Sequence, residues 1–177
     1  IYTGEGCSSN GREFKHPMSH NGGKLADLEK LVNLRKLEPK FSEHHVDERR
    51  YLKILFDRLN DGCICFIATH NHEVLGHLWV AFTKLYENEM NRNIILSHEA
   101  VMFFDLYTSS SYRGLGIAPK ITEHVFNYLK VNNYEKIYVM VNQQNFSSRK
   151  TTEKNFKPID VITFIKFFGY SYVSHRS

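Results

Sequence analysis

A glycine-rich junction between an apolar segment and an amphipathic helix constrains this chain more than any other feature. Residues 101–107 are predicted to form a strand, and Arg113-Gly114-Leu115-Gly116-Ile117-Ala118 follows it. From about residue 116 to 131, apolar residues recur at every fourth position, which predicts a helix with one buried face. They are Ile117, Ile121, Val125 and Leu129. Pro119 falls in the first helical turn, where its missing N–H costs little.

A junction of this kind is suited to phosphate. Gly114 and Gly116 lack the side chains that would keep a ligand away from the backbone. The first N–H groups of a helix have no partners inside it and lie at the positive end of its dipole, so they can point together at an anion. The alternative is a glycine-rich turn that binds no ligand.

The loop resembles the Q/R-x-x-G-x-G/A pyrophosphate loop of the GNAT superfamily, the acyl-CoA-dependent N-acyltransferases. The preceding Asp105-Leu106-Tyr107-Thr108 resembles the end of that family's fourth strand, and Tyr112 stands where an aromatic residue is frequent. The string that opens the family's fourth helix is matched by Asn145, Ser148, Glu153-Lys154 and Phe156. The resemblance covers residues 62 to 168.

The order of predicted elements favours an α/β (α+β) fold with a mixed sheet and helices on both faces. Two helices are predicted first, one over 24–37 and one from an N-cap at Ser42 to Asp61-Gly62. The buried face of the second helix is predicted to hold Leu52, Leu55, Phe56 and Leu59. The other elements are strands 63–69, 74–85, 94–108, 136–141, 159–168 and 170–173, the helix 116–131 and a short helix 145–154. The resemblance implies a GNAT-like, mostly antiparallel central sheet of six to seven strands, with a splay between the fourth and fifth.

The expected organisation is a single domain over 24–177. It is preceded by a segment 1–23, rich in Gly, Ser, Asn and His, that we expect to be disordered or truncated, because the chain begins with Ile rather than Met. Only 12–18 in that segment favours a short strand. With 42% hydrophobic residues in a chain of 177, there is ample material for one core.

Charge and cysteine content narrow the class of protein. The net charge of +4 is dispersed and forms no basic stretch interleaved with aromatics, so we expect no nucleic-acid partner, although a polyanionic cofactor would be attracted. Cys63 and Cys65 alternate along one strand and are expected to be buried and reduced. No apolar run reaches about 18 residues, so a cytoplasmic protein without a membrane partner is expected.

The resemblance implies acetyl-CoA or coenzyme A as the cofactor. Its pyrophosphate would lie on the loop formed by Arg113, Gly114, Leu115, Gly116, Ile117 and Ala118. Backbone groups of Leu106, Tyr107 and Thr108 would pair with the pantetheine arm in the manner of an added strand. Asn145 and Ser148 would contact the cofactor from the following helix.

The implied reaction is direct transfer of an acyl group from the thioester to a primary amine of a small molecule. Since an ammonium ion must lose a proton before it attacks, a carboxylate near the reacting strand is expected to act as base. Asp105 is favoured, with a purely substrate-binding role or a pairing with a lysine as its alternative. Glu99 is the second candidate and otherwise an exposed strand-start residue. On a regular strand both share a face with Tyr107, and a bulge would change this register.

Departures from the family pattern keep other interpretations open. The general-acid tyrosine of many members is replaced here by Thr152, so Tyr107, Tyr112, Tyr170 or solvent would protonate the departing thiolate. A backbone N–H near Tyr107 or Thr108 would stabilise the oxyanion. The alternative function is a catalytically weak acyl-CoA-binding sensor or scaffold module. A homodimer through the aromatic-rich segment 164–172 is a further expectation.

Histidine pairs elsewhere are expected to be solvated polar residues. His44-His45 with Glu48 lies on the first turn of a predicted helix, and His70 and His72 flank a hairpin turn. No metal is expected. A nucleophilic Cys-His pair made from Cys63 or Cys65 lacks any local signature.

Overall fold

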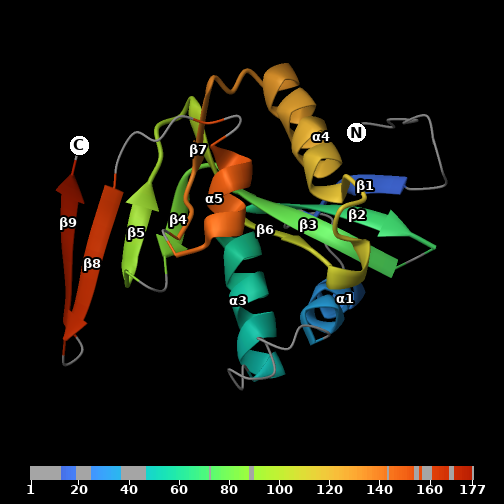
Figure 1. Cartoon of the computed structure of the whole chain (residues 1–177), viewed down its shortest axis with the longest axis horizontal. Coiled ribbons are helices and arrows are strands. Elements are labelled where there is room, and N and C mark those ends of the chain that lie inside the picture. The colour runs from blue at the N-terminus through green and yellow to red at the C-terminus, as the bar shows by residue number, and fades with distance from the viewer. Residues whose placement is uncertain are drawn as a thin grey trace.

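The protein is built around a five-stranded sheet with the order β1-β2-β3-β6-β7 (Figure 1). A computed structural model describes residues 13–18, 25–36, 47–71, 73–87, 90–142, 144–153, 156, 161–167 and 170–176. The strands of this sheet are β1 (Glu13–Met18), β2 (Ile64–His70), β3 (Glu73–Ala81), β6 (Ala100–Thr108) and β7 (Lys136–Val139). All neighbours are antiparallel except β6 and β7, which are parallel. The predicted mixed, mostly antiparallel sheet is confirmed.

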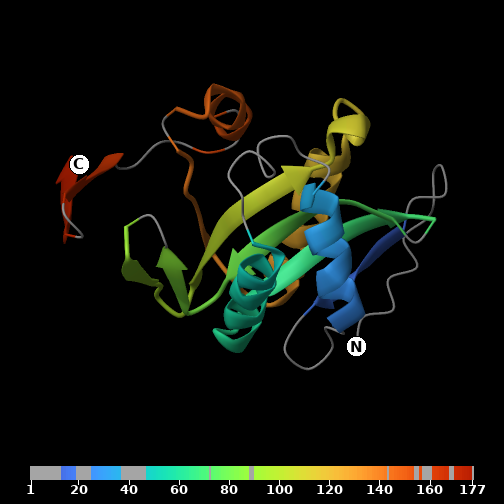
Figure 2. The same ribbon diagram turned by 90° about the horizontal axis from the view of Figure 1, so that it is seen from below.

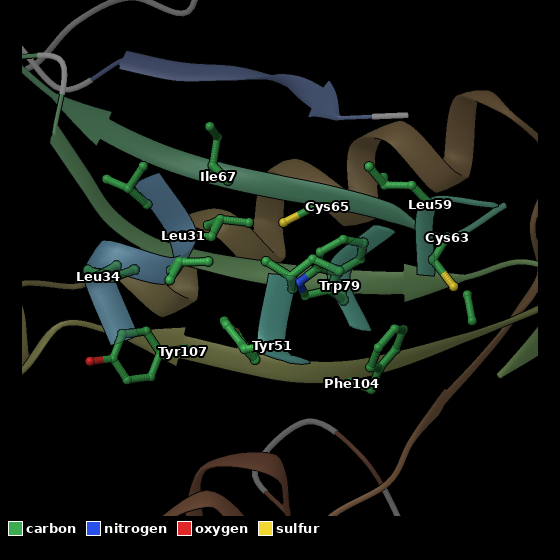
Figure 3. Close-up of a cluster of buried hydrophobic side chains, with 14 of the residues drawn as sticks. Leu31, Leu34, Tyr51, Leu59, Cys63, Cys65, Ile67, Trp79, Phe104 and Tyr107 are labelled. Carbon is green, nitrogen blue, oxygen red and sulfur yellow. The ribbon is translucent and has the colours of Figure 1, made fainter. Parts of the chain in front are cut away.

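Helices cover both faces of the sheet, as predicted (Figures 1 and 2). Helices α1 (Leu25–Lys36) and α3 (Glu48–Asn60) lie on one face, and α4 (Ile117–Val131) lies on the other. The side chains between them form two hydrophobic clusters, one on each face. Figure 3 shows the first cluster, in which Trp79 lies between Leu31 of α1 and Phe104 of β6.

The buried faces of the helices follow the apolar spacing. In α4 the four residues Ile117, Ile121, Val125 and Leu129 are all buried, which confirms the prediction. In α3 the buried residues are Tyr51, Leu55 and Leu59. The predicted face was partly wrong, because Phe56 is 40% exposed and Leu52 is only partly buried. This helix begins with Asp47 as its N-cap, and Ser42 lies outside the described residues.

Two long strands predicted from the sequence are each divided. The segment 74–85 contains all of β3 but its first residue, together with the start of β4 (Lys84–Glu87). The segment 94–108 contains the end of β5 (Arg92–Ile95) and all of β6. Strands β4 and β5 pair with each other as a separate antiparallel ribbon. The chain bends at Phe82 and Thr83, and a turn closed by Ala100 N to Ser97 O (3.0 Å) separates β5 from β6. The pattern of apolar residues in the sequence contains no signal for these bends.

The C-terminal strands form a second ribbon. β8 (Val161–Phe167) and β9 (Tyr170–Arg176) pair antiparallel, and the short helix α5 (Phe146–Thr152) precedes them. The central sheet of the described residues therefore has five strands, fewer than the six to seven expected. At the other edge of the central sheet, β1 pairs with β2. β1 is the short strand that was predicted over 12–18, so part of the segment 1–23 belongs to the sheet.

A β-bulge in β6 sets the direction of the side chains near its end. His77 and Trp79 of β3 face Tyr107 and Phe104 of β6, so one residue of β3 lies opposite two of β6, Asp105 and Leu106. Asp105 adopts a left-handed backbone with φ of 49°, which aspartate tolerates better than most residues. Because of the extra residue, Phe104 and Tyr107 both contribute to the cluster under α1 and α3.

Gly76 permits β3 to approach this bulge. A Cβ atom at Gly76 would lie 2.6 Å from the carbonyl oxygen of Tyr107, closer than real carbon contacts allow. The backbone of β6 therefore occupies the space that a side chain would need. The register of the two strands depends on glycine at this position.

Substitution of Gly76 by alanine is expected to lower the free energy of unfolding by about 1–3 kcal/mol, because the added methyl group forces β3 and β6 apart. Urea unfolding of the variant measures this. Gly62→Asn is the matched control, since Gly62 has a φ of 80°, a Cβ added there would have no atom within 4 Å, and asparagine accepts this conformation. An unchanged urea midpoint for Gly76→Ala would contradict the proposed contact.

Cys63, just before β2, and Cys65, within it, lie in the first cluster, and neither forms a disulfide, as predicted. Burial raises the pKa of the Cys63 thiol from 9.0 to about 11, with Arg58 as a smaller opposing influence. Burial also raises the pKa of Cys65 well above its ordinary value, and the charge of Asp105 adds to this. The two thiols are therefore protonated at neutral pH and poor nucleophiles.

In a Cys7→Ser variant, Cys63 and Cys65 are expected to resist Ellman's reagent at pH 8 until the protein is unfolded in guanidinium. Because the pKa of Cys63 is higher folded than unfolded, its stabilising contribution is complete below pH 9.0 and is lost as the pH rises toward about 11. The free energy of unfolding should fall over that range. Rapid labelling of either thiol in the folded protein would show that burial does not protect it.

Candidate functional site

The loop between β6 and α4 is a tight turn held by its own arginine. A short 3₁₀ segment, Ser110–Tyr112, leads into Arg113, whose Nε donates to the carbonyl oxygen of Thr108 at 3.1 Å. Gly114 and Gly116 have φ values of 78° and 74°. A Cβ at either glycine would meet no protein atom within 4 Å, so the protein itself needs glycine there for the left-handed backbone and not for space.

The start of α4 presents backbone donors. Gly116 is its N-cap and has no side-chain cap, and the hydrogen bond from Lys120 N to Gly116 O, at 3.2 Å, is the first of the helix. Pro119 has no N–H. The amides of Gly116, Ile117 and Ala118 therefore precede the helical ladder, at the positive end of the dipole of a 15-residue helix. Leu115 beside them is half-exposed. This arrangement can bind a phosphate group.

The sheet opens next to this loop. β6 and β7 pair in parallel only from Ala100 opposite Lys136 to Phe103 opposite Val139. β6 continues to Thr108 along β3, whereas the chain after β7 turns away toward α5 (Figure 2). This is the splay predicted between the fourth and fifth strands of the sheet. At Leu106, Tyr107 and Thr108, β6 therefore lies beyond its register with β7.

Helix α5 carries the predicted residues Asn145 and Ser148. Asn145 is the N-cap, and its Oδ1 accepts a hydrogen bond from Ser148 N at 3.1 Å. Phe156, which follows α5, packs against Phe103 of β6 and Phe126 of α4, with ring centroids 6.5 and 6.2 Å apart. This aromatic contact holds the end of α5 against the α4 side of the sheet.

A polar cluster lies on the opposite face, under the bulge. Asp105 Oδ2 is 2.7 Å from Arg58 Nη1, and the two side chains are only 16% and 19% exposed. His77 is fully buried, with its Nε2 3.8 Å from Asp105 Oδ1 and its ring 5.6 Å from that of Tyr107. The Arg58 guanidinium lies over the rings of Trp79 and Phe104, at 5.2 and 5.0 Å.

Sequence reasoning missed Arg58 and His77. A signal for Arg58 was present, because it lies seven residues after Tyr51 and three after Leu55, on the buried side of α3. The sequence leaves open a pairing of Asp105 with a lysine. In the structure, the Asp105 carboxylate accepts a hydrogen bond from Arg58. His77 carried no comparable signal, since a single polar residue within an apolar strand has many explanations.

Glu99 lies at the other end of β6. It sits in the turn before the strand and binds Lys136 Nζ at 3.1 Å. The hydrogen bond from Lys136 lowers the pKa of Glu99, and the same bond raises the pKa of Lys136. Glu99 precedes β6 and Asp105 is the sixth residue of that strand, so the two lie about 20 Å apart. The structure therefore brings Asp105 and Tyr107 together and leaves Glu99 apart.

The predicted substitutes for the missing tyrosine occupy different places. Tyr107 is buried next to His77, Tyr112 packs partly buried against the α4-side cluster, and Tyr170 begins β9. Thr152 is the last residue of α5.

A hollow of about 120 Å³ lies near α3 and β4, and Arg58 belongs both to its lining and to the polar cluster. Its other lining residues are Ile54, Asp57, Asp61, Cys63, Leu85 and Tyr86.

The described part of the chain contains neither a metal-binding cluster nor a membrane-spanning helix. No three His, Cys, Asp or Glu side chains there gather closely enough to hold a metal ion. His44, His45 and His72 lie outside it. None of the helices described combines the length and apolar character that crossing a membrane requires.

Known structures share this architecture. The aminoglycoside N-acetyltransferase AAC(6')-Iy, solved with a bisubstrate analog, is 19% identical, with 88% of this chain and 97% of that chain covered and a TM-score of 0.63. An aminoglycoside acetyltransferase from an uncultured soil metagenomic sample, in complex with sisomicin, is 15% identical, with coverages of 89% and 95% and a TM-score of 0.56. A predicted acetyltransferase from Clostridium acetobutylicum, with acetyl-CoA, is 17% identical, with coverages of 84% and 91% and a TM-score of 0.54. At sequence identities of 15 to 19%, the similarity to these structures shows a shared fold and no more.

A search by sequence of curated proteins found no match. A sequence profile of the acetyltransferase (GNAT) family, which uses acetyl-CoA, does match, over residues 28–156. That range contains the α4 loop, the splayed strands, α5 and the polar cluster around Asp105. This chain belongs to the GNAT acetyltransferase family.

Proposed function

We propose that this protein is an N-acyltransferase that moves an acetyl or other acyl group from acyl-CoA directly to a primary amine of a small molecule. The observation that carries the proposal is that the start of α4, which has no side-chain cap, lies next to the edge of β6 from which β7 has splayed away. In this proposal the start of α4 binds a phosphate, and the edge of β6 accepts an extended arm. Coenzyme A has both parts, a pyrophosphate and a pantetheine chain.

In this proposal the cofactor lies across the splay. The amides of Gly116, Ile117 and Ala118 donate to the pyrophosphate, while Arg113 and the left-handed Gly114 keep the loop in shape around Leu115. Backbone groups of β6 over 106–108 pair with the pantetheine arm as an added strand would. Asn145 binds the arm through its Nδ2, because its Oδ1 already caps Ser148. Ser148 contacts the cofactor from the same helix turn.

The chemistry proposed is a single addition and elimination at the thioester. The amine nitrogen bonds to the acyl carbon, the carbon–sulfur bond breaks, and the sulfur leaves as the thiolate of coenzyme A. Asp105 takes the proton of the amine, directly or through water. A backbone N–H near Tyr107 or Thr108 stabilises the oxyanion. The buried, protonated Cys63 and Cys65 favour direct transfer over an acyl-cysteine intermediate.

The acceptor is proposed to be a small amine. Two of the structurally similar proteins are aminoglycoside acetyltransferases, one of them solved with sisomicin.

An alternative function is supported by Thr152, which stands in place of the family's tyrosine at the end of α5. Without a general acid, the protein would act as a sensor or scaffold that binds acyl-CoA and transfers its acyl group poorly.

Release of free thiol from acetyl-CoA, measured against a panel of polyamines, amino sugars and amino acids, tests the proposal. An amine-dependent rate above the background hydrolysis is expected for at least one acceptor class, with the acetylated amine identified by mass spectrometry. Binding of acetyl-CoA without turnover over the whole panel would favour the sensor or scaffold. Absence of binding in calorimetry would exclude both functions.

Gly116→Ala is expected to weaken acetyl-CoA binding at least tenfold, about 1.4 kcal/mol, because alanine strains the left-handed N-cap and directs a methyl group at the pyrophosphate. Isothermal titration calorimetry measures the affinity. Gly62→Asn, remote from the loop, is the control and should bind as the wild type does. If Gly116→Ala and the control bound acetyl-CoA with equal affinity, the α4 amides would not be part of the cofactor site.

A further inference from the structure

Arg58 connects α3 to the bulge of β6. Its Nη1 lies 2.7 Å from Asp105 Oδ2, a contact between residues 47 positions apart in the sequence. Its guanidinium also lies over the rings of Trp79 and Phe104, at 5.2 and 5.0 Å. An ion pair and two cation–π contacts hold the guanidinium at one place.

Asp105 combines an unusual backbone with a poorly solvated side chain. Its φ of 49° is left-handed, a conformation that aspartate tolerates better than most residues but that still costs free energy. Its carboxylate is only 16% exposed, and a charge so poorly solvated needs a partner of opposite sign. Arg58 supplies that charge from a different element, so α3 and the bulge are fixed relative to each other.

The direction of the carboxylate is also set. Arg58 binds Oδ2, and Oδ1 faces His77 Nε2 at 3.8 Å. The pair lies where β6 departs from β7, between the last paired residue Phe103 and the end of the strand at Thr108. A base for an acceptor amine must lie at this place if the pantetheine arm runs along the same edge.

We propose that Arg58 is a positioning residue of the transfer reaction: it compensates the charge of the Asp105 carboxylate and orients it at the bulge to take the proton of the amine. This rests on the proposed function, in which Asp105 is the base. The proton passes from the ammonium to the carboxylate and then to solvent, while Arg58 keeps its charge throughout. Arg58 itself touches neither the acceptor nor the thioester.

The pH dependence of turnover separates this role from a structural one. Among the described residues, the titratable groups near the Asp105 carboxylate include His77 on β3 and Cys65 on β2, and Tyr107 on β6 lies beside His77. A nearby cation favours the charged carboxylate, so its removal makes protonation easier. Without Arg58, the acid limb of the kcat/KM profile should therefore move to higher pH.

The experiment compares Arg58→Met, Arg58→Lys and Asp105→Asn with the wild type in the thiol-release assay from pH 5 to 9. Methionine keeps the length of the side chain and removes its charge, and we expect kcat to fall at least tenfold, with an upward shift of the acid limb and acetyl-CoA affinity within twofold. Lysine keeps the charge and should restore the acid limb with part of kcat. Asp105→Asn should lose the limb altogether.

Arg50→Met is the matched control, because Arg50 is exposed on the same helix. Thermal unfolding of each variant shows which are folded at the assay temperature, and Arg58→Lys keeps the test valid if the methionine variant unfolds. In His77→Gln the acid limb should persist, and its loss would assign the limb to His77 and overturn the inference. A folded Arg58→Met variant with an unchanged pH profile would overturn it as well.

The two proposals fail in distinguishable ways. A wild-type protein without turnover on the amine panel overturns the proposed function, and the role of Arg58 falls with it. A wild-type protein that turns over, with Arg58 variants whose kcat and acid limb match those of Arg50→Met, overturns only the role of Arg58.

Discussion

The slip in register between β3 and β6 is the constraint on which the candidate site depends. Without the extra residue at 105–106, strict alternation would place Tyr107 on the α4 face, opposite to Phe104. With it, Asp105 and Tyr107 reach the face covered by α1 and α3, where Arg58 and His77 lie. Gly76 allows the slip because the Tyr107 carbonyl occupies the space beside it.

The sheet thereby separates two kinds of charge recognition. On the α4 side, the proposed binding of an anion would rely on backbone dipoles at a helix start, which need no ionised side chain. On the other side, a carboxylate and a guanidinium lie among aromatic rings in a poorly solvated layer, where they interact strongly. The splay between β6 and β7 lies between these regions, so an extended thioester could reach from one to the other.

The parts of the fold that could be predicted are those encoded by neighbours in the sequence. The apolar stripe of α4, its two glycines and the hairpin between β2 and β3 follow from local spacing and turn residues. The contact of Arg58 with Asp105 and the fit of Gly76 against Tyr107 join distant segments, so no local pattern contains them. The division of 74–85 and 94–108 was missed because bends at apolar positions leave the composition of a strand unchanged.

The aromatic cluster of Phe103, Phe126 and Phe156 has a consequence for stability. Among the described ring contacts, those of Phe156 fasten the chain after α5 to the main sheet. β7 ends at Val139, and in the described part of the chain β8 and β9 pair with each other and with no other strand. A ligand bound both to the α4 loop and to Asn145 would be a second fastening between these parts. Such a ligand would bind the assembled form more tightly than a form with α5 detached. A saturating concentration would therefore suppress local opening of α5, and it would raise the free energy of global unfolding by at least as much.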